Sequence, residues 1–223
     1  MASRYGTGEL YGLDLCALPA HGIRELASAP YKSQPCPFKA ALPGKPAPRC
    51  NKKGGVCSLR LLKQGADGRV EGKGEPVVTC PNRFLEGNLV AEWVGETLLG
   101  TSRPVVISEL PFLMGEIQSE EGEEGAVGKI DEVLVNAEGG ALRWCALEFQ
   151  AVYFSGKSME NDFRVMREWT GPGVPFPAVQ RRPDFRSSGP KRLMPQLQIK
   201  VPTISRWGPD WVTTTEGELW LTT

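Results

Sequence analysis

Two carboxylates and a carboxamide stand at positions where they can share a metal ion. If Gly139-Gly140 is the turn of a hairpin, the numbers of any two residues paired across its strands add up to 279. Asp131 then faces Glu148 directly across the strands. Gln150 lies two residues beyond Glu148, so it points to the same face of the sheet. Facing carboxylates repel each other by about 0.2 to 1 kcal/mol, which indicates a cation between them. Hard oxygen ligands of this kind favour Mg²⁺.

The hairpin itself is predicted from the residues around these positions. Residues 129–135 and 141–154 have the apolar pattern of strands, and Gly139-Gly140 between them is a favoured two-residue turn. The alternative is an exposed hairpin whose charged side chains simply face solvent. That alternative accounts well for Glu132 and Glu138, and less well for Glu148 and Gln150, which interrupt the apolar run of the second strand.

Four cysteines fall in a segment that has too few periodic apolar residues for a core of its own. This segment, residues 31–81, is rich in proline and glycine, so we expect loops that need a staple. Two disulfides are one possibility, but disulfides are rare in the reducing compartment that a chain without a signal peptide occupies. Four thiolates also suit a tetrahedral zinc or mononuclear iron site. The candidate ligands are Cys36, Cys50, Cys57 and Cys80, whereas Cys16 and Cys145 lie outside the segment.

The charged residues are segregated along the chain. Residues 31–73 hold ten Lys or Arg against two carboxylates, residues 102–140 hold nine carboxylates against two basic residues, and residues 179–206 hold seven Lys or Arg against one carboxylate. One interpretation is a set of solvated faces whose charges cancel in space. The other is a pair of basic arms that hold a polyanion over an acidic, metal-binding centre.

The composition excludes several classes of protein. The 223 residues are 40% hydrophobic and 23% charged, which is typical of a folded globular chain. The 26 basic and 26 acidic residues exclude a globally basic nucleic-acid binder. The single histidine, His21, disfavours Ser-His-Asp triads and multi-histidine metal sites. Because the chain has neither a membrane-length apolar run nor a hydrophobic start, we expect a cytoplasmic protein.

The elements that must position these residues indicate an α/β (α+β) fold. We expect an N-terminal arm at 1–30, the cysteine segment at 31–81 packed on the core, and the core at 82–223. A mixed sheet flanked by helices follows from the order of elements in the core. The apolar spacing predicts helices at 82–100 and 158–169, strands at 103–110, 129–135, 141–154 and 196–204, an acidic loop at 119–128 and mostly loop at 172–195.

Taken together, the acidic hairpin and the cysteine segment resemble a known nuclease family. An Asp followed by Glu-x-Gln on a hairpin is similar to the catalytic core of the PD-(D/E)XK nuclease fold. Combined with the cysteine segment, the pattern resembles the NotI group of type II restriction endonucleases, discontinuously from about residue 31 to 205. The motifs that carry the resemblance are Cys36-Pro-Phe, Cys50, Gly55-Val-Cys57, Cys80-Pro, Gly115-Glu-Ile, Asp131, Glu148-Phe-Gln150 and Pro190-Lys-Arg-Leu-Met-Pro-Gln-Leu.

The resemblance implies a role for each of these residues. The four cysteines would bind one structural iron atom, with zinc as the alternative. Asp131 and Glu148 would hold Mg²⁺, and Gln150 would orient water or phosphate from the position where most relatives have lysine. Glu116, fifteen residues before Asp131, would be a helper carboxylate. Nearby carboxylates compete for that last role: Glu109, Glu120, Glu121, Glu123 and Glu124.

The implied function is Mg²⁺-dependent cleavage of double-stranded DNA at a specific palindromic site. The enzyme would act as a homodimer, and a cognate DNA methyltransferase would protect host DNA. Mg²⁺ on carboxylates supports phosphodiester hydrolysis without histidine. The alternatives are a catalytically inactive or truncated, metal-stapled DNA-binding relative, and a structural zinc protein. The candidate DNA contacts are Lys39, Arg49, Lys52, Lys53, Arg181, Arg182, Arg186, Lys191 and Arg192.

Overall fold

The chain forms two compact units, each built from two separate stretches of sequence. The computed structural model describes residues 2–41, 43–116, 124–138, 142–156, 158–207, 210–215 and 218–222, with main chain alone at 113–116, 124–127, 207, 210–215 and 218–222. Unit 1 consists of Met1–Gly87 and Ala151–Ser188, and unit 2 consists of Asn88–Gln150 and Gly189–Thr223.

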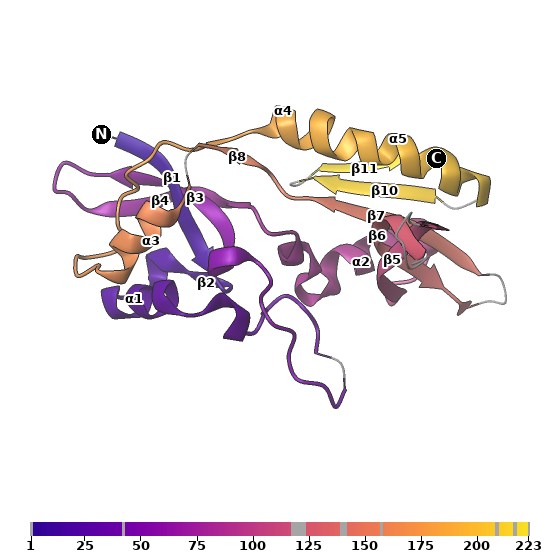
Figure 1. Cartoon of the computed structure of the whole chain (residues 1–223), viewed down its shortest axis with the longest axis horizontal. Coiled ribbons are helices and arrows are strands. Elements are labelled where there is room, and N and C mark those ends of the chain that lie inside the picture. The colour runs from indigo at the N-terminus through magenta and orange to yellow at the C-terminus, as the bar shows by residue number, and fades with distance from the viewer. Residues whose placement is uncertain are drawn as a thin grey trace. The chain divides into compact units, whose positions relative to one another are not determined.

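Unit 1 contains a four-stranded antiparallel sheet with helices beside it (Figure 1). Its elements are β1 (Ala2–Leu10), β2 (Leu13–Asp14), α1 (Ala20–Ser28), β3 (Val56–Gln64), β4 (Val70–Val78), β8 (Phe154–Ser155), α3 (Glu160–Arg167), β9 (Arg182–Pro183) and α4 (Phe185–Ser188). The strand order of the sheet is β2-β1-β3-β4, and β8 pairs with β9. The helix predicted at 158–169 is confirmed by α3.

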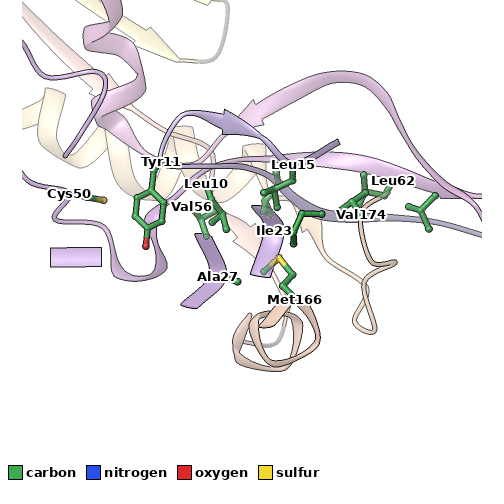
Figure 2. Packing of buried hydrophobic residues seen from close by; sticks show 12 residues of the cluster. Leu10, Tyr11, Leu15, Ile23, Ala27, Cys50, Val56, Leu62, Met166 and Val174 are labelled. Carbon is green, nitrogen blue, oxygen red and sulfur yellow. The ribbon is translucent and has the colours of Figure 1, made fainter. Parts of the chain in front are cut away.

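One apolar cluster joins the sheet of unit 1 to its two longer helices. Leu10 of β1 and Leu62 of β3 share this cluster with Ile23 of α1 and Met166 of α3, and all four side chains are buried. Figure 2 shows Ile23 and Met166 next to each other in the cluster. Unit 1 therefore has a hydrophobic core of its own.

Residues 2–28, where the sequence predicts an N-terminal arm, contribute β1, β2 and α1 to this core. β1 pairs along its length with β3, from Ala2 opposite Gln64 to Leu10 opposite Val56. β1 contains glycines, so it lacks the alternation of apolar and polar residues by which a strand is recognised in a sequence. At Gly6, a Cβ atom would lie 2.5 Å from Cγ of Pro177, so only glycine lets these segments approach.

Unit 2 is a mixed five-stranded sheet with a helix on each face, which confirms the predicted fold class. Its elements are α2 (Leu89–Val94) with a π-helical turn at Gly95–Leu99, β5 (Val105–Glu116), β6 (Glu124–Asn136), β7 (Arg143–Gln150), a second π-helical turn at Gly189–Leu193, α5 (Met194–Ile204), β10 (Asp210–Thr215) and β11 (Glu218–Thr222). The strand order is β11-β10-β7-β6-β5, in which only the β10–β7 pair among the described strands is parallel.

Alternate residues of β6 and β7 face the two helices of unit 2. Leu134 and Cys145 are paired across the strands and share a cluster with α2. Val133 and Ala146, the neighbouring pair, share a cluster with Ile204 of α5. Strand alternation thus assigns Val133 of β6 and Ala146 of β7 to the face covered by α5. Ile130 shares the same cluster, so the regular alternation of β6 is interrupted between Ile130 and Val133.

The sequence prediction is wrong for residues 196–204, which form most of α5 and not a strand. Leu197, Ile199 and Val201 alternate as in a strand, but Leu197, Val201 and Ile204 also recur at helical spacing. The helical set packs on the sheet, and Ile199 is exposed. The loop predicted at 172–195 is also partly wrong, because residues 185–193 are helical.

The other predicted elements of unit 2 agree with the structure in their main parts. The helix predicted at 82–100 is present as α2 and its π-helical turn, preceded by 3₁₀ turns at Pro81–Asn88 and ended by Gly100 in the left-handed region. The strands predicted at 103–110, 129–135 and 141–154 correspond to β5, β6 and β7. Of the predicted acidic loop, residues 124–128 belong to β6 and 119–123 lie outside the described residues.

No helix in the described part of the chain has both the length and the apolar character needed to cross a membrane.

Two isoleucines of α5 distinguish the helix from the predicted strand. Ile204 is 0% exposed, so Ile204→Ala should lower the free energy of unfolding by about 2 to 5 kcal/mol. Ile199 is 54% exposed, so Ile199→Ala should change it by less than about 0.5 kcal/mol. Urea unfolding of both variants measures the difference. Equal losses would contradict the helical assignment.

Candidate active site

The predicted hairpin register is confirmed next to the acidic residues. β6 and β7 pair from Glu132 opposite Leu147 to Asn136 opposite Arg143, so paired positions sum to 279. Asp131 and Glu148 are the next couple in this register, but the backbone bridges of the described strands end just before them. The predicted Gly139-Gly140 turn lies outside the described residues.

Side chains replace the backbone bridge at Asp131 and Glu148. Asp131 Oδ2 accepts a hydrogen bond of 2.8 Å from the Phe149 amide. In return, the Glu148 carboxylate accepts a hydrogen bond from the Asp131 amide. Each carboxylate is therefore held by a main-chain N–H of the opposite strand, and the sheet sets the position of both.

A lysine on α5 completes this acidic pair. Lys200 Nζ lies 2.6 Å from Glu148 Oε1, and both side chains are buried, at 5% and 2% exposure. The same ammonium group donates to the carbonyl oxygen of Lys129 at 2.5 Å and to Gln196 Oε1 at 3.4 Å. In the sequence, Lys200 stands out only as one of the basic residues of the segment 179–206. On a helix, its spacing from Leu197 and Ile204 places it on the apolar face, and this is the signal that identifies it.

The electrostatics of the site are dominated by burial. Desolvation raises the pKa of Glu148 to about 7; the hydrogen bond from Lys200 lowers it, and the charge of Asp131 raises it again. A buried carboxylate that needs a cation in order to ionise lies beside a second carboxylate. Lys200 supplies the positive charge that this buried carboxylate needs.

Glu132 lies on the opposite face of the sheet from this pair. Its partner Leu147 belongs to the cluster with α2, and the side chain of Glu132 is 6% exposed. Burial, and then the charge of Asp131, raise the pKa of Glu132 to about 7. The interpretation of Glu132 as a solvent-facing residue is therefore wrong.

Gln150 is the last residue of β7 and is half-buried. By strand alternation it follows Glu148 on the face covered by α5. The structure thus places Glu148 and Gln150 on one face of β7, with Asp131 beside Glu148 on the adjacent strand.

Glu116 lies far from this group along the strands. In the β5–β6 register it stands opposite Glu124, seven residues before Asp131 on β6. At about 3.3 Å per residue this is a separation of roughly 23 Å. The residue level with Asp131 on β5 is Glu109, between Ser108 opposite Glu132 and Leu110 opposite Ile130.

Glu109 has a local conformation that sets it apart from the rest of β5. Its φ of 55° lies in the left-handed region, which is uncommon for a residue other than glycine. Its carboxylate contacts Lys129 Nζ at 3.3 Å. Both side chains of this ion pair are exposed.

The four candidate cysteines lie buried in unit 1, in two backbone-linked couples. The amides of Cys36 and Cys50 donate to Pro48 and Gln34 across the loop that they close, and the Cys80 amide donates to the Cys57 carbonyl. Asn82 connects the couples, because its side chain donates to Cys36 Sγ at 3.8 Å and its amide donates to Cys80.

The cysteines are free thiols that influence each other electrostatically. Burial is the main cause that raises the pKa of Cys57 to about 12; a hydrogen bond from the Gly12 backbone opposes it, and the neighbouring Cys80 and Cys50 add to it. Burial also raises the pKa of Cys80, with contributions from Cys36 and Cys50. These mutual effects place the four thiols in one region of unit 1.

Neither centre is arranged as a finished metal site. No group of three or more His, Cys, Asp or Glu side chains within the described ranges is placed to hold a metal ion as it stands.

Comparison with known proteins gives one match. A family model described as restriction endonuclease NotI matches residues 23–219. The chain belongs to the NotI family of restriction endonucleases. Searches of curated proteins and of solved structures found no match. As a member of the NotI family, the chain is a site-specific deoxyribonuclease, a hydrolase whose substrate is DNA.

For a NotI-family enzyme, the accessibility of the candidate DNA contacts matters. Arg181 is buried, with its guanidinium 2.5 Å from Asp162, so it has a role inside unit 1. Lys52 and Arg49 donate to the carbonyl oxygens of Thr79 and Ser33. Lys39 is half-buried, and the remaining candidates are exposed: Lys53, Arg182, Arg186, Lys191 and Arg192.

Proposed function

We propose that this chain is a Mg²⁺-dependent restriction endonuclease that hydrolyses both strands of DNA at a palindromic site. The observation that carries the proposal is the pair of carboxylates, Asp131 and Glu148, fixed by each other's strands beside the ammonium group of Lys200. Restriction endonucleases generally use Mg²⁺, and two carboxylates with a nearby carboxamide offer the hard oxygen atoms that Mg²⁺ prefers.

The proposed roles follow from these positions. Asp131 and Glu148 hold Mg²⁺, and unit 2 is the nuclease core of PD-(D/E)XK type. When bound, Mg²⁺ supplies the positive charge that activates water and stabilises charge at phosphorus. Gln150, from the end of β7, donates a hydrogen bond to water or to a phosphate oxygen and fixes its orientation. A neutral carboxamide stabilises negative charge less than an ammonium group does.

We assign the third acidic position to Glu109. Glu116 is separated from Asp131 by seven residues of β6, whereas Glu109 is level with Asp131 and contacts the neighbouring Lys129. A carboxylate that is level with Asp131 on the neighbouring strand can share in binding Mg²⁺ or a water molecule attached to it.

The proposal extends to the partners and to unit 1. A palindromic site is matched by two-fold symmetry, so the enzyme acts as a homodimer. A DNA methyltransferase of the same system protects host DNA. The exposed basic residues Arg182, Arg186, Lys191, Arg192 and Lys53 bind phosphates. Cys36, Cys50, Cys57 and Cys80 hold one iron atom, or zinc, that stabilises the loops before β3 and after β4.

Cleavage of DNA by a carboxylate variant tests the function. Unmethylated phage DNA should give discrete bands with Mg²⁺ and none with EDTA. Glu148→Gln removes a charge without changing the shape of the side chain, so it should slow cleavage by at least about 100-fold while DNA binding persists. Glu138→Gln, on an exposed carboxylate, is the matched control and should cut like the wild type. Binding without cleavage by the wild type would instead support an inactive relative.

The assignment of the third carboxylate is tested by a pair of variants. Glu109→Gln should lower the rate of cleavage at limiting Mg²⁺ by about 10-fold or more, because a charge near the metal is lost. Glu116→Gln should leave this rate unchanged. Cleavage rates measured over a range of Mg²⁺ concentrations compare the two, and the opposite ranking would return the role to Glu116.

Metal analysis of the purified protein tests the cysteine site. We expect iron or zinc at about one atom per chain by mass spectrometry of the metals. Cys57→Ser should lose this metal and melt about 10 °C lower. Cys16→Ser, outside the cluster, is the control and should keep both. Full metal content in Cys57→Ser would show that these thiols serve only packing.

A further inference from the structure

The ammonium group of Lys200 donates hydrogen bonds to acceptors that belong to unit 2. Three acceptors surround it: the Glu148 carboxylate, the Lys129 carbonyl and the Gln196 side chain. An ammonium group has three N–H donors, so each can be paired. A lysine this deeply buried loses the hydration of its charge, and such lysines are retained where the charge has a partner or a task.

The position of Lys200 coincides with the place where the strand pairing changes. The Asp131 amide points toward β7, since it donates to Glu148. Lys129, two residues earlier on β6, lies beyond the last β6–β7 bridge, and its carbonyl accepts from Lys200. Lys200 therefore joins a main-chain oxygen of β6 to a side chain of β7, beside the two carboxylates.

The hydrophobic side of α5 fixes the helix that carries this lysine. Leu197, Val201 and Ile204 pack against the sheet on the face of Asp131 and Glu148. Apolar residues before and after Lys200 in the sequence thus fix the position of its charged group against the sheet. On β7, by contrast, the side chain that follows Glu148 on this face is the neutral Gln150.

We propose that Lys200 is a positioning residue of the active site, which fixes the orientation of the Glu148 carboxylate for Mg²⁺ and supplies from α5 the positive charge that Gln150 lacks. This inference rests on the proposed function. Removal of the ammonium group takes away the 2.6 Å contact that fixes the Glu148 carboxylate, so Mg²⁺ meets a ligand that is no longer held in place. A lysine that only fastened α5 to the sheet would have no effect on Mg²⁺ affinity.

Substitutions at Lys200 separate these roles. Lys200→Met keeps the length and volume of the side chain, and Lys200→Gln keeps a donor without the charge. Lys200→Met combined with Gln150→Lys moves the charge from α5 to β7. Gln198→Met, at an exposed position of the same helix, is the matched control. Mg²⁺ affinity is measured by calorimetry on DNA-free protein, together with melting temperature and single-turnover cleavage of unmethylated phage DNA.

We expect Lys200→Met and Lys200→Gln to weaken Mg²⁺ binding and slow cleavage at limiting Mg²⁺ by about 10- to 100-fold, as loss of a residue that orients a metal ligand does. The double variant should recover at least about 10-fold of this loss, and Gln198→Met should match the wild type. If Lys200→Met melts below the assay temperature, Lys200→Gln decides the question.

The proposal is overturned if a folded Lys200 variant binds Mg²⁺ and cleaves DNA like the wild type, or if the double variant remains as weak as Lys200→Met. In either case, wild-type cleavage that is lost in Glu148→Gln still supports the endonuclease. A wild-type protein that neither binds Mg²⁺ nor cleaves DNA overturns both proposals.

Discussion

A carboxylate buried inside a sheet is costly unless it is hydrogen-bonded and paired, and the architecture of unit 2 satisfies this constraint at Glu148. The β6–β7 ladder opens at this point, so that the Asp131 amide can donate to the carboxylate. α5 must lie across this face to deliver Lys200. The apolar contacts of the helix and the charge at its centre therefore depend on each other.

The two candidate metal centres use opposite chemistry. The acidic pair of unit 2 offers hard oxygen atoms around a buried charge, which suits a metal that exchanges water and acts on phosphate. The cysteines of unit 1 offer soft sulfur atoms that are shielded from solvent, which suits a metal that stays in place. Each centre lies within one unit, so its geometry is set by that unit's own strands and loops.

The sequence predicts the acidic hairpin well because strand pairing is local. Once two strands are close in sequence, the alternation of side chains and the sum of paired positions follow from elementary geometry, and Asp131 and Glu148 come together as expected. The third carboxylate is different. Spacing along the chain suggested Glu116, but its place depends on how β5 aligns with β6, and this alignment puts Glu109 beside Asp131 instead.

The positions of Lys200 and of β1 could not be predicted from the sequence alone. The segment around Lys200 alternates like a strand and repeats like a helix, and only packing against Ile130 and Val133 decides between the two. In β1, a glycine allows Pro177 to approach from far along the chain, and no local pattern contains that contact. Both cases are tertiary contacts that override local preference.

Because each unit is built from two separate stretches of sequence, the order of synthesis limits the order in which the units can fold. The chain passes from one unit to the other after Gly87, again after Gln150 and once more after Ser188. Unit 1 therefore cannot close until residues 151–188 have left the ribosome, when most of the sheet of unit 2 has already emerged. Neither unit corresponds to a continuous fragment, so a stalled or cleaved chain yields no intact half. The acidic site of such a nuclease is complete only after α5 has been synthesised, because α5 lies in the second stretch of unit 2.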